Sequence, residues 1–259
     1  MNRSILLAIS VVVSLAMVAV ALLWAKPLLV SDVTASYEVQ GDSIVLLEGE
    51  PEPWHAAAWE RWVELVPESA RWRVARFDAI AGSSEGQVEP ISDNLQVWTL
   101  RIAELDDRLR DVALIHELGH LVSLGPSEVV PATDPSVEDE CVTYFSVEGC
   151  AIPGSLFDRF VTTFWAEEDR APSEQSALQR YRLNSEAYVS GYAATNPGED
   201  IAETFVFFVY RLRPTGTTIA DEKIALFWEF PELVELRLWL RRGLSGYLTG
   251  SPGSSPSQR

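Results

Sequence analysis

Residues 114–122, with the sequence LIHELGHLV, constrain the fold of this chain more than any other stretch. In a helix, His116 and His120 lie four residues apart and project from one face, about 40° from one another. Apolar residues fill the opposite side and also border the histidine side, so the helix is predicted to be buried. Buried polar groups without partners are costly, and a metal ion would supply a partner for these two histidines and Glu117.

The spacing suits catalysis as well as binding. His116 and His120 can bind one metal ion, and Glu117 on the same turn can reach a water molecule beside it. Catalytic zinc usually has three protein ligands and one open position. A third histidine six residues after His120 is excluded, because Pro126 occupies that position, and Ser123 stands where the metzincin class has glycine.

A second helix is predicted to begin in the stretch 192–205, YAATNPGEDIAETF. Asn196 is a good N-cap, Pro197 suits the first helical position and Glu199 falls at the third. The core-facing stripe is predicted to consist of Ile201, Phe205, Phe208 and Leu212.

Glu199 and Glu203 share a different face of this helix, one turn apart. One can bind the metal, and the other can accept a hydrogen bond from a ligand histidine and orient it. We expect Glu199 to be the ligand. The alternative is that Glu199 only completes a capping box with Asn196 and that Glu203 is solvated.

The two blocks together resemble the gluzincin metallopeptidases, in particular the group of anthrax lethal factor and the Pro-Pro endopeptidases. The resemblance implies an α+β, zincin-like fold, mostly helical with a small sheet, and peptide-bond hydrolysis by a metal-activated water. The implied cofactor is Zn²⁺, with the ligands His116, His120 and Glu199. It also implies Glu117 as the base, Tyr192 as a donor to the oxyanion and Glu203 as the carboxylate behind a ligand histidine.

The sequence departs from this group in two places. A long segment separates the two blocks, and Asp200 stands where lethal factor has an aromatic residue. Two alternatives to a peptidase stay open: a catalytically silent zincin-like binding or structural domain, and an extracellular interaction module without metal.

The N-terminal segment predicts a membrane anchor. Residues 5–25 form an uncharged run, interrupted only by Ser10 and Ser14. As a helix this run is roughly 31 Å long, enough to cross a bilayer core. Arg3 favours an N-terminus inside the cell and a single-pass topology, with the remaining chain outside the cytoplasm. A cleaved signal peptide and a secreted product are the alternative.

The net charge bears on the partners of the chain, and the cysteines predict a covalent link within it. The formal net charge is −18, which argues against nucleic acid as a partner and leaves a protein or peptide substrate and the membrane. Cys141 and Cys150 are the two cysteines and predict a local disulfide.

The expected organisation is an anchor at 1–30, a tether at 31–52 ending in a short strand at 43–47, a zincin-like domain at 53–248 and a disordered tail at 249–259. Within the domain, hydrophobic periodicity and cap residues predict helices at 54–66, after Asp106 or Asp107, at 155–166, at 173–183, after Asn196 and at 219–240 with a break at 230–231. Strands are predicted at 71–77 and 95–102, and a disulfide-pinned loop at 126–153.

Overall fold

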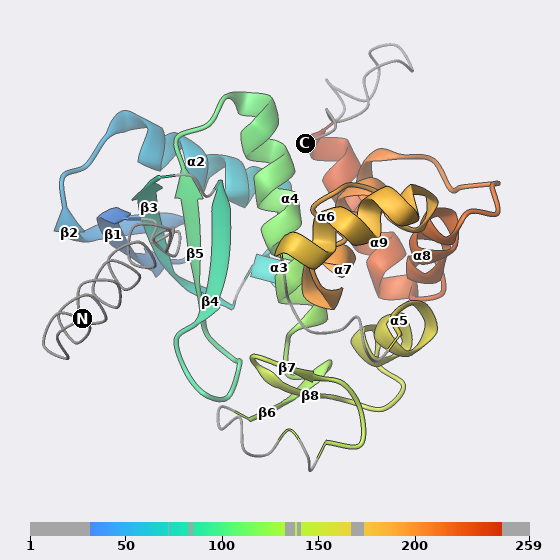
Figure 1. Ribbon diagram of the computed structural model, residues 1–259. Coiled ribbons are helices and arrows are strands. Elements are labelled where there is room, and N and C mark those ends of the chain that lie inside the picture. The colour runs from blue at the N-terminus through green and yellow to red at the C-terminus, as the bar shows by residue number, and fades with distance from the viewer. Residues whose placement is uncertain are drawn as a thin grey trace, which may run out of the picture.

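The computed structural model describes residues 32–71, 73–82, 85–132, 138, 141–166 and 174–244 (Figure 1). The predicted anchor at 1–30 and tail at 249–259 lie outside these residues. Across the described residues, no helix is both long and apolar enough to cross a membrane. The fold is α+β, as predicted, with helices packed beside a small sheet (Figure 1).

Five strands of the described chain form one sheet in the order β2-β1-β3-β5-β4. Strands β3 and β5 are parallel, and the other neighbours are antiparallel. The strands are β1 Asp32–Gln40, β2 Ser43–Gly49, β3 Val74–Ala81, β4 Gly86–Pro90 and β5 Trp98–Ala103. The predicted strands at 71–77 and 95–102 are therefore present but begin at Val74 and Trp98.

The prediction of a tether before the strand is wrong for residues 32–40, which form β1, whereas the short strand predicted at 43–47 is confirmed as part of β2. Strands β1 and β2 form a hairpin at one edge of the sheet, and β1 also pairs with β3. Ala35 and Tyr37 alternate inward and are buried, which gives β1 a core-facing side. The hairpin turns at Gly41, whose positive φ of 63° is the conformation that glycine adopts without strain.

The helices largely follow the predictions from periodicity and caps. They are α2 Pro53–Leu65, α3 Glu68–Arg71, α4 Asp107–Ser123, α5 Leu156–Phe164, α6 Glu174–Leu183, α7 Pro197–Tyr210, α8 Ile219–Phe227 and α9 Pro231–Gly243, with a 3-10 turn, η3, at Ser185–Ala187. The break predicted at 230–231 separates α8 from α9.

The segment 126–153 is more structured than the predicted loop. It contains a second small sheet in the order β6-β8-β7. Its strands are β6 Val129–Pro131, β7 Phe145–Ser146 and β8 Gly149–Ala151. The predicted disulfide between Cys141 and Cys150 is confirmed, and it ties the segment before β7 to β8.

Helices α4 and α7 lie side by side in the centre of the molecule (Figure 1). Helix α4 is buried as predicted, with Leu114, Ile115 and Leu118 fully enclosed. The stripe predicted on α7 is buried at Ile201, Phe205 and Phe208 but wrong at Leu212, which is 79% exposed. The helix ends at Tyr210, so Leu212 lies beyond it.

Candidate metal centre

Helix α4 carries the two histidines and is fixed at its N-terminal half. The Asp106 carboxylate caps it by accepting hydrogen bonds from the backbone N–H groups of residues 108 and 109, both at 3.0 Å. One turn further, both carboxylate oxygens of the buried Asp111 accept hydrogen bonds from Arg61, from Nε and from Nη2, each at 2.7 Å. These contacts hold the helix that presents His116 and His120.

Helix α7 begins where the sequence predicts. The Asn196 side chain accepts a hydrogen bond from the backbone N–H of Glu199 at 3.0 Å. Gly119 allows α7 to approach α4 closely, because a Cβ atom there would lie 2.9 Å from the Cα of Ala202. This contact brings the first turn of α7, and with it Glu199, over the two histidines.

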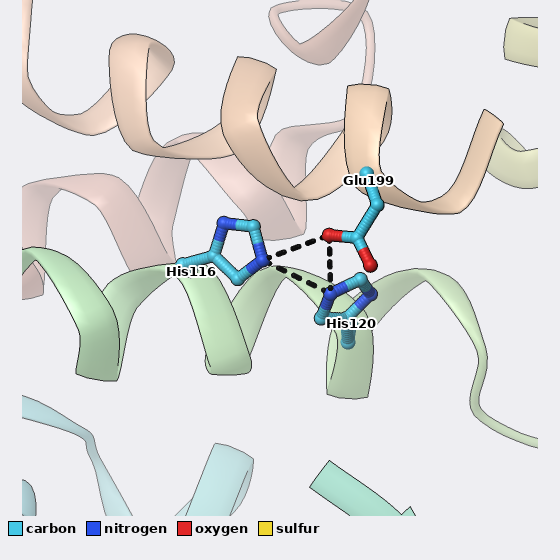
Figure 2. A group of neighbouring side chains, drawn as sticks. All are labelled: His116, His120 and Glu199. Atoms are coloured by element: carbon cyan, nitrogen blue, oxygen red, sulfur yellow. Dashed lines mark hydrogen bonds and ion pairs between the residues drawn. The ribbon is translucent and has the colours of Figure 1, made fainter. Parts of the chain in front are cut away.

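The three predicted ligands meet in one place (Figure 2). Nε2 of His116 lies 3.1 Å from Nε2 of His120 and 3.2 Å from Oε2 of Glu199. Nε2 of His120 lies 3.4 Å from the same carboxylate oxygen. Three potential ligand atoms therefore form a nearly equilateral triangle.

The size of this triangle fits a tetrahedral zinc ion. Zinc binds imidazole nitrogen and carboxylate oxygen at about 2.0–2.2 Å, which places neighbouring ligand atoms of a tetrahedron about 3.3 Å apart. The observed separations of 3.1, 3.2 and 3.4 Å bracket that value. Two imidazoles and one carboxylate are also a donor set that zinc accepts, and they leave a fourth position open.

Glu203 lies behind the triangle, as predicted. Its Oε1 is 2.9 Å from Nδ1 of His116. Because a carboxylate accepts, Nδ1 carries a hydrogen. In the neutral imidazole, which is the form that binds a metal ion, Nε2 then has the lone pair that faces the other two ligand atoms. Glu203 thus selects the tautomer of His116 that a metal ion needs.

Ser190 is a site residue that the sequence analysis missed. Its hydroxyl donates to Oε2 of Glu203 at 2.6 Å and accepts from the backbone N–H of Ala193 at 3.0 Å. A lone serine two residues before Tyr192 carries no motif of its own. No pattern in the sequence could have identified it.

The pKa values of His116, Glu199 and Glu203 are shifted by their neighbours in this cluster. Burial lowers the pKa of His116, but hydrogen bonds with Glu199 and Glu203 outweigh burial and raise that pKa well above its ordinary value. Burial raises the pKa of Glu199, and the two histidines reverse this effect and lower it below the ordinary value. The pKa of Glu203 is lowered in the same way by His116. Glu199 and Glu203 are therefore ionised near neutral pH, the state in which a carboxylate can bind a metal ion or accept from a ligand histidine.

Glu117 is 4% exposed, and its Oε2 has no hydrogen-bond partner among the described residues. Burial raises its pKa, partly opposed by the neighbouring His116 and His120. A buried carboxylate oxygen without a partner is unusual, since such groups are nearly always satisfied. Its other oxygen lies against Gly86 of β4, where an added Cβ would be 2.8 Å from it.

Tyr192 lies at the outer side of the site and is 51% exposed. Its ring centroid is 5.9 Å from that of His116. Partial burial raises the pKa of the Tyr192 hydroxyl, and the charges of Glu199 and Glu117 raise it further. The hydroxyl therefore keeps its proton and can act as a hydrogen-bond donor.

Asp200, the residue that departs from the resembled group, points into a different environment. It is fully buried and forms an ion pair with Lys223 at 2.6 Å, and the Trp165 indole donates to it at 2.8 Å. Burial raises its pKa to about 6, although Lys223 opposes this shift. Asp200 thus connects α7 with α8 and with the C-terminal end of α5, and it is not part of the metal centre.

Comparisons with family models, with curated proteins and with solved structures find no match to this chain. The assignment of a function therefore depends on the geometry of the site and on the motifs that form it.

Proposed function

We propose that this protein is a zinc-dependent metallopeptidase of the gluzincin type with a zincin-like fold. The observation that carries the proposal is the triangle formed by His116, His120 and Glu199, which matches a tetrahedral zinc site with one open position. A base with an unpartnered buried oxygen, Glu117, lies beside it. A purely structural site has no use for such a base.

When bound, zinc supplies Lewis-acid polarisation of the substrate carbonyl and lowers the pKa of water at the open position. Glu117 accepts the proton of the attacking water and transfers it to the leaving amine. Its burial assists because a raised pKa brings a carboxylate closer to the working pH. The neutral Tyr192 hydroxyl donates a hydrogen bond to the developing oxyanion.

Strand β4 offers a place for an extended peptide. It is the outermost strand of the sheet on the β5 side, and it pairs with β5 in antiparallel fashion. Gly86 on this strand adjoins Glu117. A substrate that adds a strand to this edge would pass beside the base, with its backbone held by hydrogen bonds.

The proposed location is the outer face of a cell membrane, with a single N-terminal helix as the anchor or, alternatively, as a cleaved signal. The Cys141–Cys150 disulfide supports an oxidising compartment. A protein or peptide is the proposed substrate.

Changing the carboxylate of Glu117 to an amide tests the proposal. In Glu117→Gln, we expect zinc content equal to wild type and turnover of a peptide library reduced at least about 100-fold, because the general base is lost. The exposed Glu186, changed to Gln, is the matched control and should retain full activity. Normal hydrolysis by Glu117→Gln would refute the mechanism. Zinc binding without turnover in the wild type would favour the catalytically silent zincin-like domain. Absence of zinc in the wild type would exclude both the peptidase and the silent zinc-binding domain.

A further inference from the structure

We propose that the hydroxyl of Ser190 is a positioning group that couples the metal centre to the loop carrying Tyr192. This inference rests on the proposed function, because it assigns a role to a residue that touches neither metal nor substrate. It is carried by the direction of three consecutive hydrogen bonds.

The first bond fixes the direction of the others. The backbone N–H of Ala193 can only donate, so Ser190 Oγ accepts it at 3.0 Å. The hydroxyl hydrogen is then free for Glu203, whose Oε2 lies 2.6 Å away. The other oxygen of Glu203 accepts from Nδ1 of His116 at 2.9 Å. The series runs from the loop backbone to a metal ligand without a break.

The same hydroxyl shapes the segment that displays Tyr192. Residues 190–195 form consecutive turns, in which Ala194 N–H bonds to Gly191 O at 3.3 Å and Thr195 N–H bonds to Tyr192 O at 3.0 Å. Ser190 closes the start of these turns through Ala193. Its loss would remove a hydrogen bond that closes the loop and also one of the two hydrogen-bond partners that Glu203 has among the described residues.

A merely structural role for Ser190 makes a different prediction. If the hydroxyl only closed the turn, its removal would affect loop order and leave the affinity for metal unchanged. If it also holds Glu203 in place, its removal weakens the orientation of His116, and loss of such a supporting group typically lowers metal affinity 10–100-fold.

The experiment measures zinc affinity of the full-length protein in detergent by competition with a chromogenic chelator. We expect Ser190→Ala to bind zinc about 10–100-fold more weakly than wild type. Ser190→Thr keeps a hydroxyl and should restore most of the affinity. The control is Ser185→Ala, at an exposed serine five residues earlier, which should match wild type.

Peptide turnover then tests the link to Tyr192. With zinc saturating, Ser190→Ala should still lower kcat, and the loss should be smaller in a Tyr192→Phe background, because the two changes act on one interaction. Additive losses would overturn the coupling.

The outcomes separate this inference from the proposed function. Unchanged zinc affinity in Ser190→Ala, with zinc bound by wild type, overturns the inference and leaves the peptidase proposal intact. No zinc in wild type overturns both. If Ser190→Ala does not fold, Ser190→Cys, which keeps the size of the side chain but is a weak donor, is measured in its place, with the same expected loss.

Discussion

The contact between Gly119 and Ala202 sets the distance between α4 and α7, and an added methyl group tests it. In Gly119→Ala, the new Cβ would lie 2.9 Å from the Cα of Ala202, whereas carbon atoms pack favourably at about 3.5–4.0 Å. The helices must therefore separate by about 0.6 Å or more. Such overpacking costs about 1–3 kcal/mol, offset by about 0.8–1.0 kcal/mol because alanine favours helix more than glycine.

The metal centre should respond more strongly than the fold. Ligand atoms must stay within about 0.2 Å of their positions, so movement of α7 displaces Glu199 beyond that tolerance. We expect zinc affinity to fall at least about tenfold, or about 1.4 kcal/mol, while the free energy of unfolding of the metal-free protein falls by at most about 2 kcal/mol. Chelator competition and urea unfolding measure these two quantities.

A second glycine provides the control. Gly198 lies in the first turn of α7, and an added Cβ there would contact only the Asn196 side chain, at 3.1 Å. Gly198→Ala should leave zinc affinity within about threefold of wild type, a change of roughly 0.7 kcal/mol. If Gly119→Ala instead stabilises the protein by about 1 kcal/mol, as at an unconstrained helical site, and binds zinc normally, the close contact does not position Glu199.

Two further predictions concern stability. Arg61→Met should lower the free energy of unfolding by about 3–5 kcal/mol, because it leaves the carboxylate of Asp111 buried and unpaired. Adding Asp111→Leu to this variant should recover most of the loss, as measured by urea unfolding. No recovery would contradict this explanation. Burial lowers the pKa of His55, whose Nδ1 accepts from the backbone N–H of Glu52 at 3.2 Å. The folded protein therefore binds fewer protons at this residue than the unfolded chain does. The stability contributed by neutral His55 is fully present above about pH 6.5, the pKa of histidine in the unfolded chain, and is lost as the pH falls below that value. Wild type should lose more stability than His55→Gln between pH 7 and 5, and parallel curves would refute the assignment.

The cap residues explain why the helices that form the site were predictable. A helix start depends on local hydrogen bonds, and both Asp106 and Asn196 satisfy backbone N–H groups within three residues of themselves. The spacing of His116 and His120 on one face is likewise a property of a single helix. Helix starts and the spacing of residues on one helix face are both determined by a short stretch of sequence.

Strand β1, and with it the pairing of the N-terminal hairpin, was missed because its stability is not local. Strand β1 pairs with β3, about forty residues later in the chain, and Tyr37 is buried against Phe77 with ring centroids 5.9 Å apart. Polar residues occupy every second position of β1, so this strand contains no continuous apolar run, and the apolar residues of β2 are mostly exposed. Only the partner strand shows which residues of β1 face the core.

At the site, too, local sequence alone could not decide between the two interpretations of Glu199. The sequence places Glu199 at the third position of a capped helix, where it could equally turn back to Asn196 or reach outward. The cap bond is present, but it is the backbone N–H of Glu199 that donates to Asn196, and this leaves the carboxylate free. The carboxylate lies 3.2 Å from His116 because Gly119 lets the two helices touch. Capping and metal binding are therefore compatible roles of one residue: the cap fixes where α7 begins, and the absence of a side chain at Gly119 brings that beginning to the histidines.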